Sequence, residues 1–275
     1  MQASDLASLP QPRADHVVPY GDAPQQHAEL RLPKGAGPHP VVILVHGGCW
    51  ETPWAVDQMR SLAAALTAEG FATFCLEYRR LGDAGGGWPG TLADVARGAD
   101  HLRGVAAAHR LDLARVVALG HSAGGQLALW LGGRHKLRKG SILWTDDPLP
   151  LRGVVSLAGI TDLRAGAAGR ICGDAIRRLL EGPPDERANR VAESSPIELL
   201  PLGVRQQLVC GSLDSLVPNQ LSGQYLLAAS QAGDAVELEV VEGVGHFELI
   251  DPLGTAWPVV LRAVHRAFQG CNSAQ

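Results

Sequence analysis

Short apolar runs alternate with helix-like segments along most of this 275-residue chain. The run at residues 41–45 is apolar at every position, which is typical of a strand covered on both faces. Further strands are predicted at residues 27–32, 71–76, 115–119, 153–157, 207–210 and 235–241, the first as an edge strand. Helices are predicted at residues 57–69, 92–105, 123–131, 218–231 and 256–268. The alternation predicts an α/β fold with a mostly parallel sheet of about seven or eight strands, helices on both faces, and ligand sites at the carboxyl ends of the strands.

Composition narrows the class of protein further. Hydrophobic residues make up 46% of the chain, enough for the core of one large domain, which we place at residues 1–275. The formal net charge of −4 leaves no basic surplus, so we expect neither nucleic acid nor an acidic membrane surface as a partner. The sequence shows no signal-peptide pattern at its start and no apolar stretch of about 18 residues. We therefore expect a cytoplasmic protein that does not span a membrane.

The cysteines do not form a pattern that indicates crosslinking or metal binding. They number five, are widely spaced and include no Cys-x-x-Cys pair; they are Cys49, Cys75, Cys172, Cys210 and Cys271. This pattern predicts neither a disulfide framework nor a zinc site. Cys75 and Cys210 end predicted strands, so we expect them to be small core residues. We expect no metal ion and no cofactor.

The segment Gly-His-Ser-Ala-Gly at residues 120–124 lies where a predicted strand gives way to a predicted helix. A serine on such a sharp turn projects its hydroxyl above the sheet, provided that the residues two before and two after it are small. Gly120 and Gly124 meet that condition. Ser122 is therefore a candidate nucleophile.

A serine nucleophile needs a histidine base, and the histidine is usually oriented by a carboxylate. His246 follows the last predicted strand and Asp214 follows the strand before it, so their loops are expected to meet above neighbouring strands. Asp214 could instead cap the helix at Pro218, and Asp251 is an alternative orienting carboxylate beside Pro252. The chain order of serine, aspartate and histidine is the one expected of α/β-hydrolases.

Acyl transfer also requires backbone N–H groups that stabilise an oxyanion. The segment His-Gly-Gly-Cys-Trp at residues 46–50 follows the first central strand, and glycine there allows a close approach to substrate. Gly47, Gly48 and Ala123, the residue after Ser122, are the candidate oxyanion-hole residues. An ordinary glycine turn at the end of a strand would have the same sequence.

Together these segments resemble the α/β-hydrolase superfamily over nearly the whole chain from about residue 41 to residue 268. Within it the chain looks like the small serine esterases related to hormone-sensitive-lipase-like carboxylesterases and to kynurenine formamidase. The resemblance implies a triad of Ser122, Asp214 and His246, and an oxyanion hole of Gly47, Gly48 and Ala123. The His-Gly-Gly-x-Trp form departs from the usual His-Gly-Gly-Gly and looks more like the kynurenine formamidase branch.

Two more segments, Glu-Tyr-Arg-Arg at residues 77–80 and Gly-Gly-Gly-Trp-Pro at residues 85–89, also look like bacterial members of this group, and the sequence assigns them no role. Residues 160–204 fall where many relatives carry a cap over the active site, and so short an insertion predicts an open site. Cys49, Trp50 and Trp88 are candidate substrate-binding residues, and Trp54 could join the two tryptophans in an apolar pocket.

The sequence thus predicts a metal-independent serine hydrolase that cleaves small carboxylic esters, with a short acyl or an aryl group, through an acyl-enzyme. An arylformamidase acting on N-formylkynurenine is the main alternative, because both reactions pass through the same kind of oxyanion. A non-catalytic ligand-binding protein of the same fold is a further alternative. The oligomeric state is not predicted.

Overall fold

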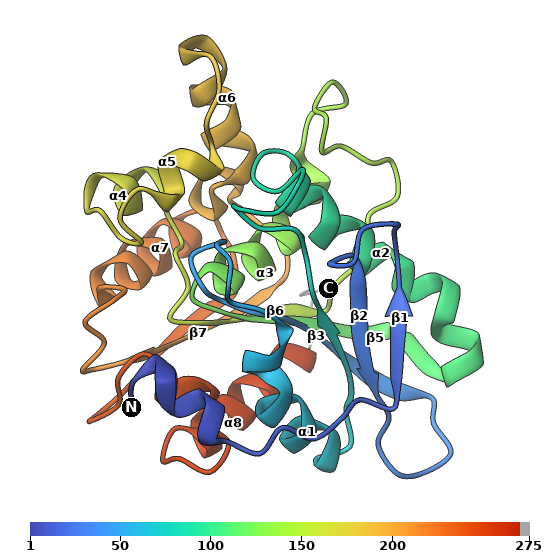
Figure 1. Ribbon diagram of the computed structural model, residues 1–275. Helices are drawn as coiled ribbons and strands as arrows, with labels where there is room; N and C mark the ends of the chain where they lie inside the picture. Colours follow the sequence, from blue (N-terminus) through green and yellow to red (C-terminus); the bar gives the residue numbers. More distant parts are fainter. Residues whose placement is uncertain (270–275) are drawn as a thin grey trace.

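A computed structural model describes residues 1–269 of the chain and shows one eight-stranded sheet between two layers of helices (Figure 1). The strands are β1 (His16–Pro19), β2 (His27–Arg31), β3 (His39–Val45), β4 (Ala72–Leu76), β5 (Leu111–His121), β6 (Gly153–Leu157), β7 (Arg205–Gly211) and β8 (Val236–Val241). Their order across the sheet is β1-β2-β4-β3-β5-β6-β7-β8. The pairings of β1 with β2 and of β2 with β4 are antiparallel, and those between the other neighbours are parallel. This architecture confirms the predicted α/β-hydrolase fold.

The sequence did not predict strand β1, and for that reason the prediction for its neighbour β2 was wrong. The segment at residues 27–32 was expected at the edge of the sheet, but β2 pairs with β4 on one side and with β1 on the other. β1 itself has only four residues, and Val18 is its one buried side chain. So short a segment carries too little alternation to be recognised in sequence.

The fully apolar strand β3 shows why both faces of the sheet are covered. Val41, Ile43 and Val45 pack into one hydrophobic cluster with residues of α2 (Gly90–His109), α3 (Ala123–Gly133) and α7 (Asn219–Gln231). Val42 and Leu44 pack into a second cluster with α1 (Arg60–Ala68), α8 (Trp257–Phe268) and the short helix η1 (Ala3–Ser8). Successive side chains of a strand point to opposite faces, so a run without polar residues requires a helix layer on each side.

The predicted insertion after β6 consists of short helices, as expected. These are α4 (Leu163–Ala168), α5 (Ala175–Leu179), α6 (Pro184–Ser194) and η4 (Pro196–Leu199). They lie on the same side of the sheet as α3 and α7 (Figure 1). Three other short helices connect the main elements: η2 (Val56–Met59), η3 (Arg134–Lys136) and η5 (Phe247–Ile250). Within residues 1–269, no helix is both long and apolar enough to cross a membrane.

Candidate active site

Ser122 occupies the tight turn between β5 and α3. Its backbone has φ 57° and ψ −121°, a conformation that residues other than glycine rarely adopt. A Cβ atom at Gly120 would overlap the carbonyl of Gly124, and one at Gly124 would overlap the carbonyl oxygen of Val45 at the end of β3. Both glycines are therefore needed for the close approach of this turn to the neighbouring strand. The strained backbone at Ser122 is the geometry that the strand-to-helix prediction requires.

His246 and Asp214 come together above the ends of β7 and β8, as their positions in the sequence predict. Nδ1 of His246 lies 2.7 Å from Oδ2 of Asp214, and the Asp214 side chain is fully buried. A further hydrogen bond of 2.8 Å, from the backbone N–H of Leu213 to the carbonyl of Val244, ties the two loops together. Because a carboxylate only accepts, the imidazole proton resides on Nδ1, and Nε2 is left with a lone pair.

The surroundings of Asp214 favour its charged form. Burial alone would raise the pKa of Asp214, but hydrogen bonds from His246 and from the N–H groups of Val217 and Leu216 outweigh burial and lower it. The alternative carboxylate, Asp251, instead accepts a 2.9 Å hydrogen bond from the N–H of Leu253 in its own turn. Asp214, rather than Asp251, is thus the carboxylate that is hydrogen-bonded to His246.

Ser122 and His246 line a cavity of about 190 Å³. Its other lining residues are Gly48, Cys49, Trp54, Gln58, His121, Cys172, Leu216, Val217 and Phe247. Among residues 1–269, no hydrogen bond joins Oγ of Ser122 to Nε2 of His246. In enzymes without bound substrate such contacts are often long and tighten when substrate binds. The walls are mostly apolar, and the volume suits a small group.

His121 is a residue of this cavity that the sequence reasoning did not single out. Its Nε2 lies 3.0 Å from the backbone oxygen of His246, which joins the Ser122 turn directly to the His246 loop. Burial, with the nearby His246, lowers the pKa of His121 to about 3, so the ring is neutral near pH 7. Its position immediately before Ser122 was the available signal, but contacts 125 residues apart in the chain cannot be seen in sequence.

Gly47 and Gly48 lie on the loop that follows β3, beside the Ser122 turn. A Cβ atom at Gly47 would lie 3.1 Å from Cβ of Ser122. Gly48 has φ +100°, and a side chain there would overlap Trp54. Within the described part of the chain, the N–H groups of Gly47, Gly48 and Ala123 donate no hydrogen bond to another residue. Of these three residues, Gly48 lines the cavity at Ser122.

The segment at residues 77–80, which had no assigned role, braces this loop. The Tyr78 hydroxyl donates a 2.8 Å hydrogen bond to the carbonyl of His46. The Glu77 carboxylate lies 3.1 Å from Nε2 of His46 and accepts a 2.9 Å hydrogen bond from the N–H of Val56. Arg80 donates to the carbonyl of Trp54. Both ends of the loop are therefore anchored to the segment after β4.

Two predicted substrate-binding residues lie outside the cavity. Trp50 is completely buried, and its Nε1 donates a 3.0 Å hydrogen bond to Gln126. Trp88, in the glycine-rich segment at residues 85–89, packs against the core, and the Arg190 guanidinium of α6 lies 5.6 Å from its ring centre. Neither ring lines the cavity at Ser122, so this geometry adds no support to their predicted role in binding substrate. Trp54 does line the cavity.

Cys49 lines the cavity, and the expectation that the cysteines form no disulfide is wrong. Cys49 and Cys172 are joined by a disulfide across 123 residues. Their spacing in sequence carried no sign of this pairing, because the fold alone brings the insertion against the loop after β3. The sulfur pair forms part of the cavity wall. Cys75 and Cys210 are buried and free, as expected.

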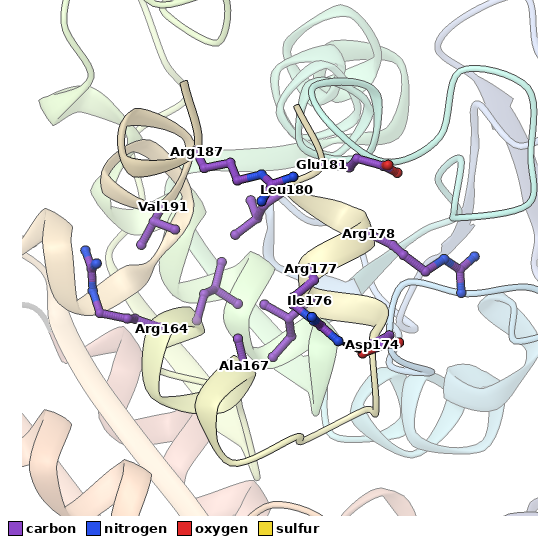
Figure 2. A pocket seen from close by; sticks show the side chains of 11 residues that line it. Arg164, Ala167, Asp174, Ile176, Arg177, Arg178, Leu180, Glu181, Arg187 and Val191 are labelled. Carbon is purple, nitrogen blue, oxygen red and sulfur yellow. Dashed lines mark hydrogen bonds and ion pairs between the residues drawn. The ribbon is translucent and has the colours of Figure 1, made fainter. Parts of the chain in front are cut away.

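A larger cavity of about 450 Å³ lies within the insertion, between α4, α5 and α6 (Figure 2). Its floor is apolar and includes Ile176, Leu180 and Val191. Ionic contacts already engage three of its arginines: Arg164 pairs with Glu198, Arg177 with Asp174, and Arg178 with Glu51. This cavity shares no lining residue with the cavity at Ser122. Size alone therefore does not identify the candidate site.

The BD-FAE family matches residues 29–227, well over half of the chain. This chain belongs to the BD-FAE family. The match covers the loop after β3, the Ser122 turn, the insertion and Asp214, and it ends within α7.

A curated relative of this BD-FAE protein is esterase LipC from Mycobacterium tuberculosis, 25% identical over 268 residues that cover 91% of the chain. The chain spans 65% of the length of that relative.

Solved structures resemble the BD-FAE protein in fold. Esterase B from Lactobacillus rhamnosis has a TM-score of 0.80 at 18% identity and covers 96% of this chain and 89% of its own. A thermophilic esterase, Est2 from Thermogutta terrifontis, has a TM-score of 0.75 at 20% identity; the match covers 98% of this chain and 100% of the Est2 chain. A truncated carbohydrate esterase from gut microbiota has a TM-score of 0.74 at 21% identity; the match covers 91% of this chain and 95% of that esterase chain. At these identities the likeness shows the fold alone.

Proposed function

We propose that this protein is a serine hydrolase that cleaves small carboxylic esters. The observation that carries the proposal is the buried Asp214–His246 hydrogen bond, which faces the same cavity as Ser122 on its strained turn. The names of the relatives are consistent with ester hydrolysis, since LipC, esterase B and Est2 are all described as esterases.

The geometry supports a two-step reaction. Nε2 of His246 takes the proton of the Ser122 hydroxyl while Oγ attacks the ester carbonyl carbon, and the negative charge collects on the former carbonyl oxygen. Collapse of this intermediate breaks the carbon–oxygen bond to the alcohol, which receives the proton from His246. Water then attacks the acyl-enzyme with His246 again as base, and the acid product leaves as Ser122 regains its proton.

Asp214 is a positioning residue in this reaction, because it acts only through His246. Its hydrogen bond to Nδ1 holds the ring in the tautomer whose Nε2 can accept a proton. The N–H groups of Gly47, Gly48 and Ala123 stabilise the oxyanion, and each such donor contributes roughly 3 kcal/mol. The segment at residues 77–80 keeps the loop of Gly47 and Gly48 in place.

The acyl group that fits is short. A cavity of about 190 Å³ is smaller than the roughly 300–1,000 Å³ of sites for drug-sized ligands. The relatives named above are esterases, and none is described as a formamidase, so the formamidase alternative stays a prediction without added support. A cytoplasmic location also stays a prediction.

The proposal is tested by comparing kcat/KM of the wild type and Ser122→Ala on p-nitrophenyl acetate. We expect a loss of more than about 10⁴-fold, because the nucleophile is removed. Ser156→Ala, which removes a buried hydroxyl from β6, is the matched control and should keep wild-type activity within a few-fold. Wild-type turnover by folded Ser122→Ala would refute the proposal.

A further inference from the structure

Gln58 is a polar residue in the wall of the Ser122 cavity, and it has no role in the proposed reaction. It belongs to η2, is only 8% exposed, and lines the cavity beside Trp54. The same two residues also line a second pocket, next to η1. Gln58 and Trp54 therefore form the partition between the active-site cavity and the amino-terminal segment.

The side-chain nitrogen of Gln58 has no partner within residues 1–269. This Nε2 atom is buried and donates no hydrogen bond. Buried polar groups are paired in nearly all native proteins, and an unpaired one costs free energy unless a ligand or water completes it. An unpaired amide nitrogen in the wall of a candidate active site is therefore a feature that a bound molecule can satisfy.

Hydrogen bonds hold the backbone around Gln58 in place. The N–H of Val56, at the start of η2, donates a 2.9 Å hydrogen bond to Glu77. The N–H of Gln58 itself donates a 3.2 Å hydrogen bond to the carbonyl of Ala55. Sites that recognise substrate by hydrogen bonds need this kind of support around the recognising group.

The rest of the wall limits what the amide can meet. Trp54, Leu216, Val217 and Phe247 offer apolar surface, and the Cys49–Cys172 disulfide offers only sulfur. His121 adds a ring whose Nδ1 also has no partner among the described residues. Ser122 and His246 are engaged in the reaction itself. A carboxamide carries a donor and an acceptor side by side, and a hydroxyl group, which both donates and accepts, can satisfy the two together.

We propose that Gln58 is a specificity-determining residue that binds a hydroxyl group of the substrate close to the scissile ester. The inference rests on the proposed function and adds a substrate class to it: short esters that carry a hydroxyl group on the acyl or the alcohol portion. A site built to bind a hydroxyl disfavours the analogue that lacks it, because its own polar groups are then left unpaired.

The experiment uses two pairs of esters in which a hydroxyl replaces a methyl group of the same size. One pair, 2-hydroxyethyl acetate and propyl acetate, places the hydroxyl on the alcohol. The other, p-nitrophenyl 3-hydroxypropanoate and p-nitrophenyl butanoate, places it on the acyl group. The ratio of kcat/KM within each pair is divided by the ratio of the alkaline hydrolysis rates, which removes the difference in intrinsic reactivity.

We expect the wild type to favour the hydroxylated ester at least about fivefold in one pair, and that pair identifies the side of the ester that Gln58 binds. Gln58→Met, which keeps the side-chain length and removes the amide, should bring this ratio close to one. Gln207→Met is the matched control, because Gln207 is also buried with an unpartnered Nε2 but does not line the cavity. Its ratio should equal that of the wild type.

A wild-type ratio near one in both pairs would overturn the inference, and so would an unchanged ratio in Gln58→Met. If Gln58→Met does not fold, the wild-type ratios and those of Gln58→Glu, which lacks the N–H donor and should show a reduced ratio, decide the question. Failure of the inference is distinguishable from failure of the proposed function. In the first case ester hydrolysis still depends on Ser122, and in the second it survives Ser122→Ala.

Discussion

The imidazole of His246 donates to the carboxylate of Asp214 over 2.7 Å, although 32 residues separate the two in the chain. The contact forms because β7 and β8 are adjacent and parallel, so the loops that follow them leave the sheet at the same edge. It determines which imidazole nitrogen faces the cavity with a lone pair. The proposed chemistry at Ser122 depends on this one hydrogen bond.

Asp214→Asn should lower kcat/KM for p-nitrophenyl acetate by about 10³–10⁴-fold while the protein stays folded. The amide can offer a donor to Nδ1 and so favour the tautomer in which Nε2 cannot accept the proton of Ser122. Asp251→Asn is the matched control, because Asp251 bonds only within its own turn, and it should change kcat/KM less than about threefold. An equal loss in both variants would contradict the assignment of Asp214.

Glu77→Gln should reduce the free energy of unfolding by about 3 kcal/mol at pH 7, measured by urea titration. Burial alone would raise the pKa of Glu77, but the contact with His46, the N–H of Val56 and the charge of Arg80 lower it from 4.5 to about 2. The stabilisation is therefore present above pH 4.5 and is lost as the pH falls toward 2.

The difference in stability between the wild type and Glu77→Gln should accordingly shrink between pH 5 and pH 2.5. Glu69→Gln, at an exposed carboxylate after α1, should show neither the loss at pH 7 nor the pH dependence. A difference that stays constant with pH would mean that the charge of Glu77 is not what stabilises the loop.

His121 should make the protein less stable as the pH falls below about 6.5. The pKa of His121 is about 3 in the folded state and 6.5 in the unfolded chain. As the pH falls from 6.5 toward 3, the unfolded state therefore binds a proton that the folded state does not, and this favours unfolding. The slope for one proton is at most about 1.4 kcal/mol per pH unit. Urea titrations of His121→Gln between pH 6.5 and pH 4.5 should show a smaller slope than the wild type. His101→Gln, on α2, should keep the wild-type slope, and a shared reduction would rule out His121 as the cause.

Replacing both Cys49 and Cys172 with alanine should lower the free energy of unfolding by about 2–4 kcal/mol, because the disulfide closes a loop of 123 residues. A phosphine reductant should destabilise the wild type by the same amount and leave the double variant unchanged. The substitution should also raise KM, since both cysteines line the cavity. Equal sensitivity of wild type and double variant to the reductant would show that the disulfide is not the stabilising contact.

Features that depend on neighbouring residues were predictable from the sequence. The run at residues 41–45 and the strand-to-helix change around Ser122 are local patterns, and β3, β5 and α3 lie where these patterns place them. The positions of Asp214 and His246 after consecutive strands were enough to predict their contact, because adjacent parallel strands end at one edge of a sheet.

Features that depend on long-range packing were not predictable. Trp50 follows the two glycines of the loop and suggested a substrate contact, yet its ring turns inward to meet Gln126, 76 residues away. The pairing of Cys49 with Cys172 depends on how the insertion folds back onto the loop after β3. Gln58 carried no local pattern, because its significance lies in the absence of a partner for its amide nitrogen among the described residues.

The most direct test of the account is to locate the covalent bond formed with a fluorophosphonate probe. Peptide mass spectrometry of the labelled wild type should place one phosphonyl group on Ser122, because Oγ attacks the phosphorus and fluoride leaves. Ser122→Ala should remain unlabelled, whereas Ser156→Ala should be labelled as fully as the wild type. Modification of a different residue, or a wild type that hydrolyses esters and takes up no label, would contradict the central claim that Ser122 is the nucleophile.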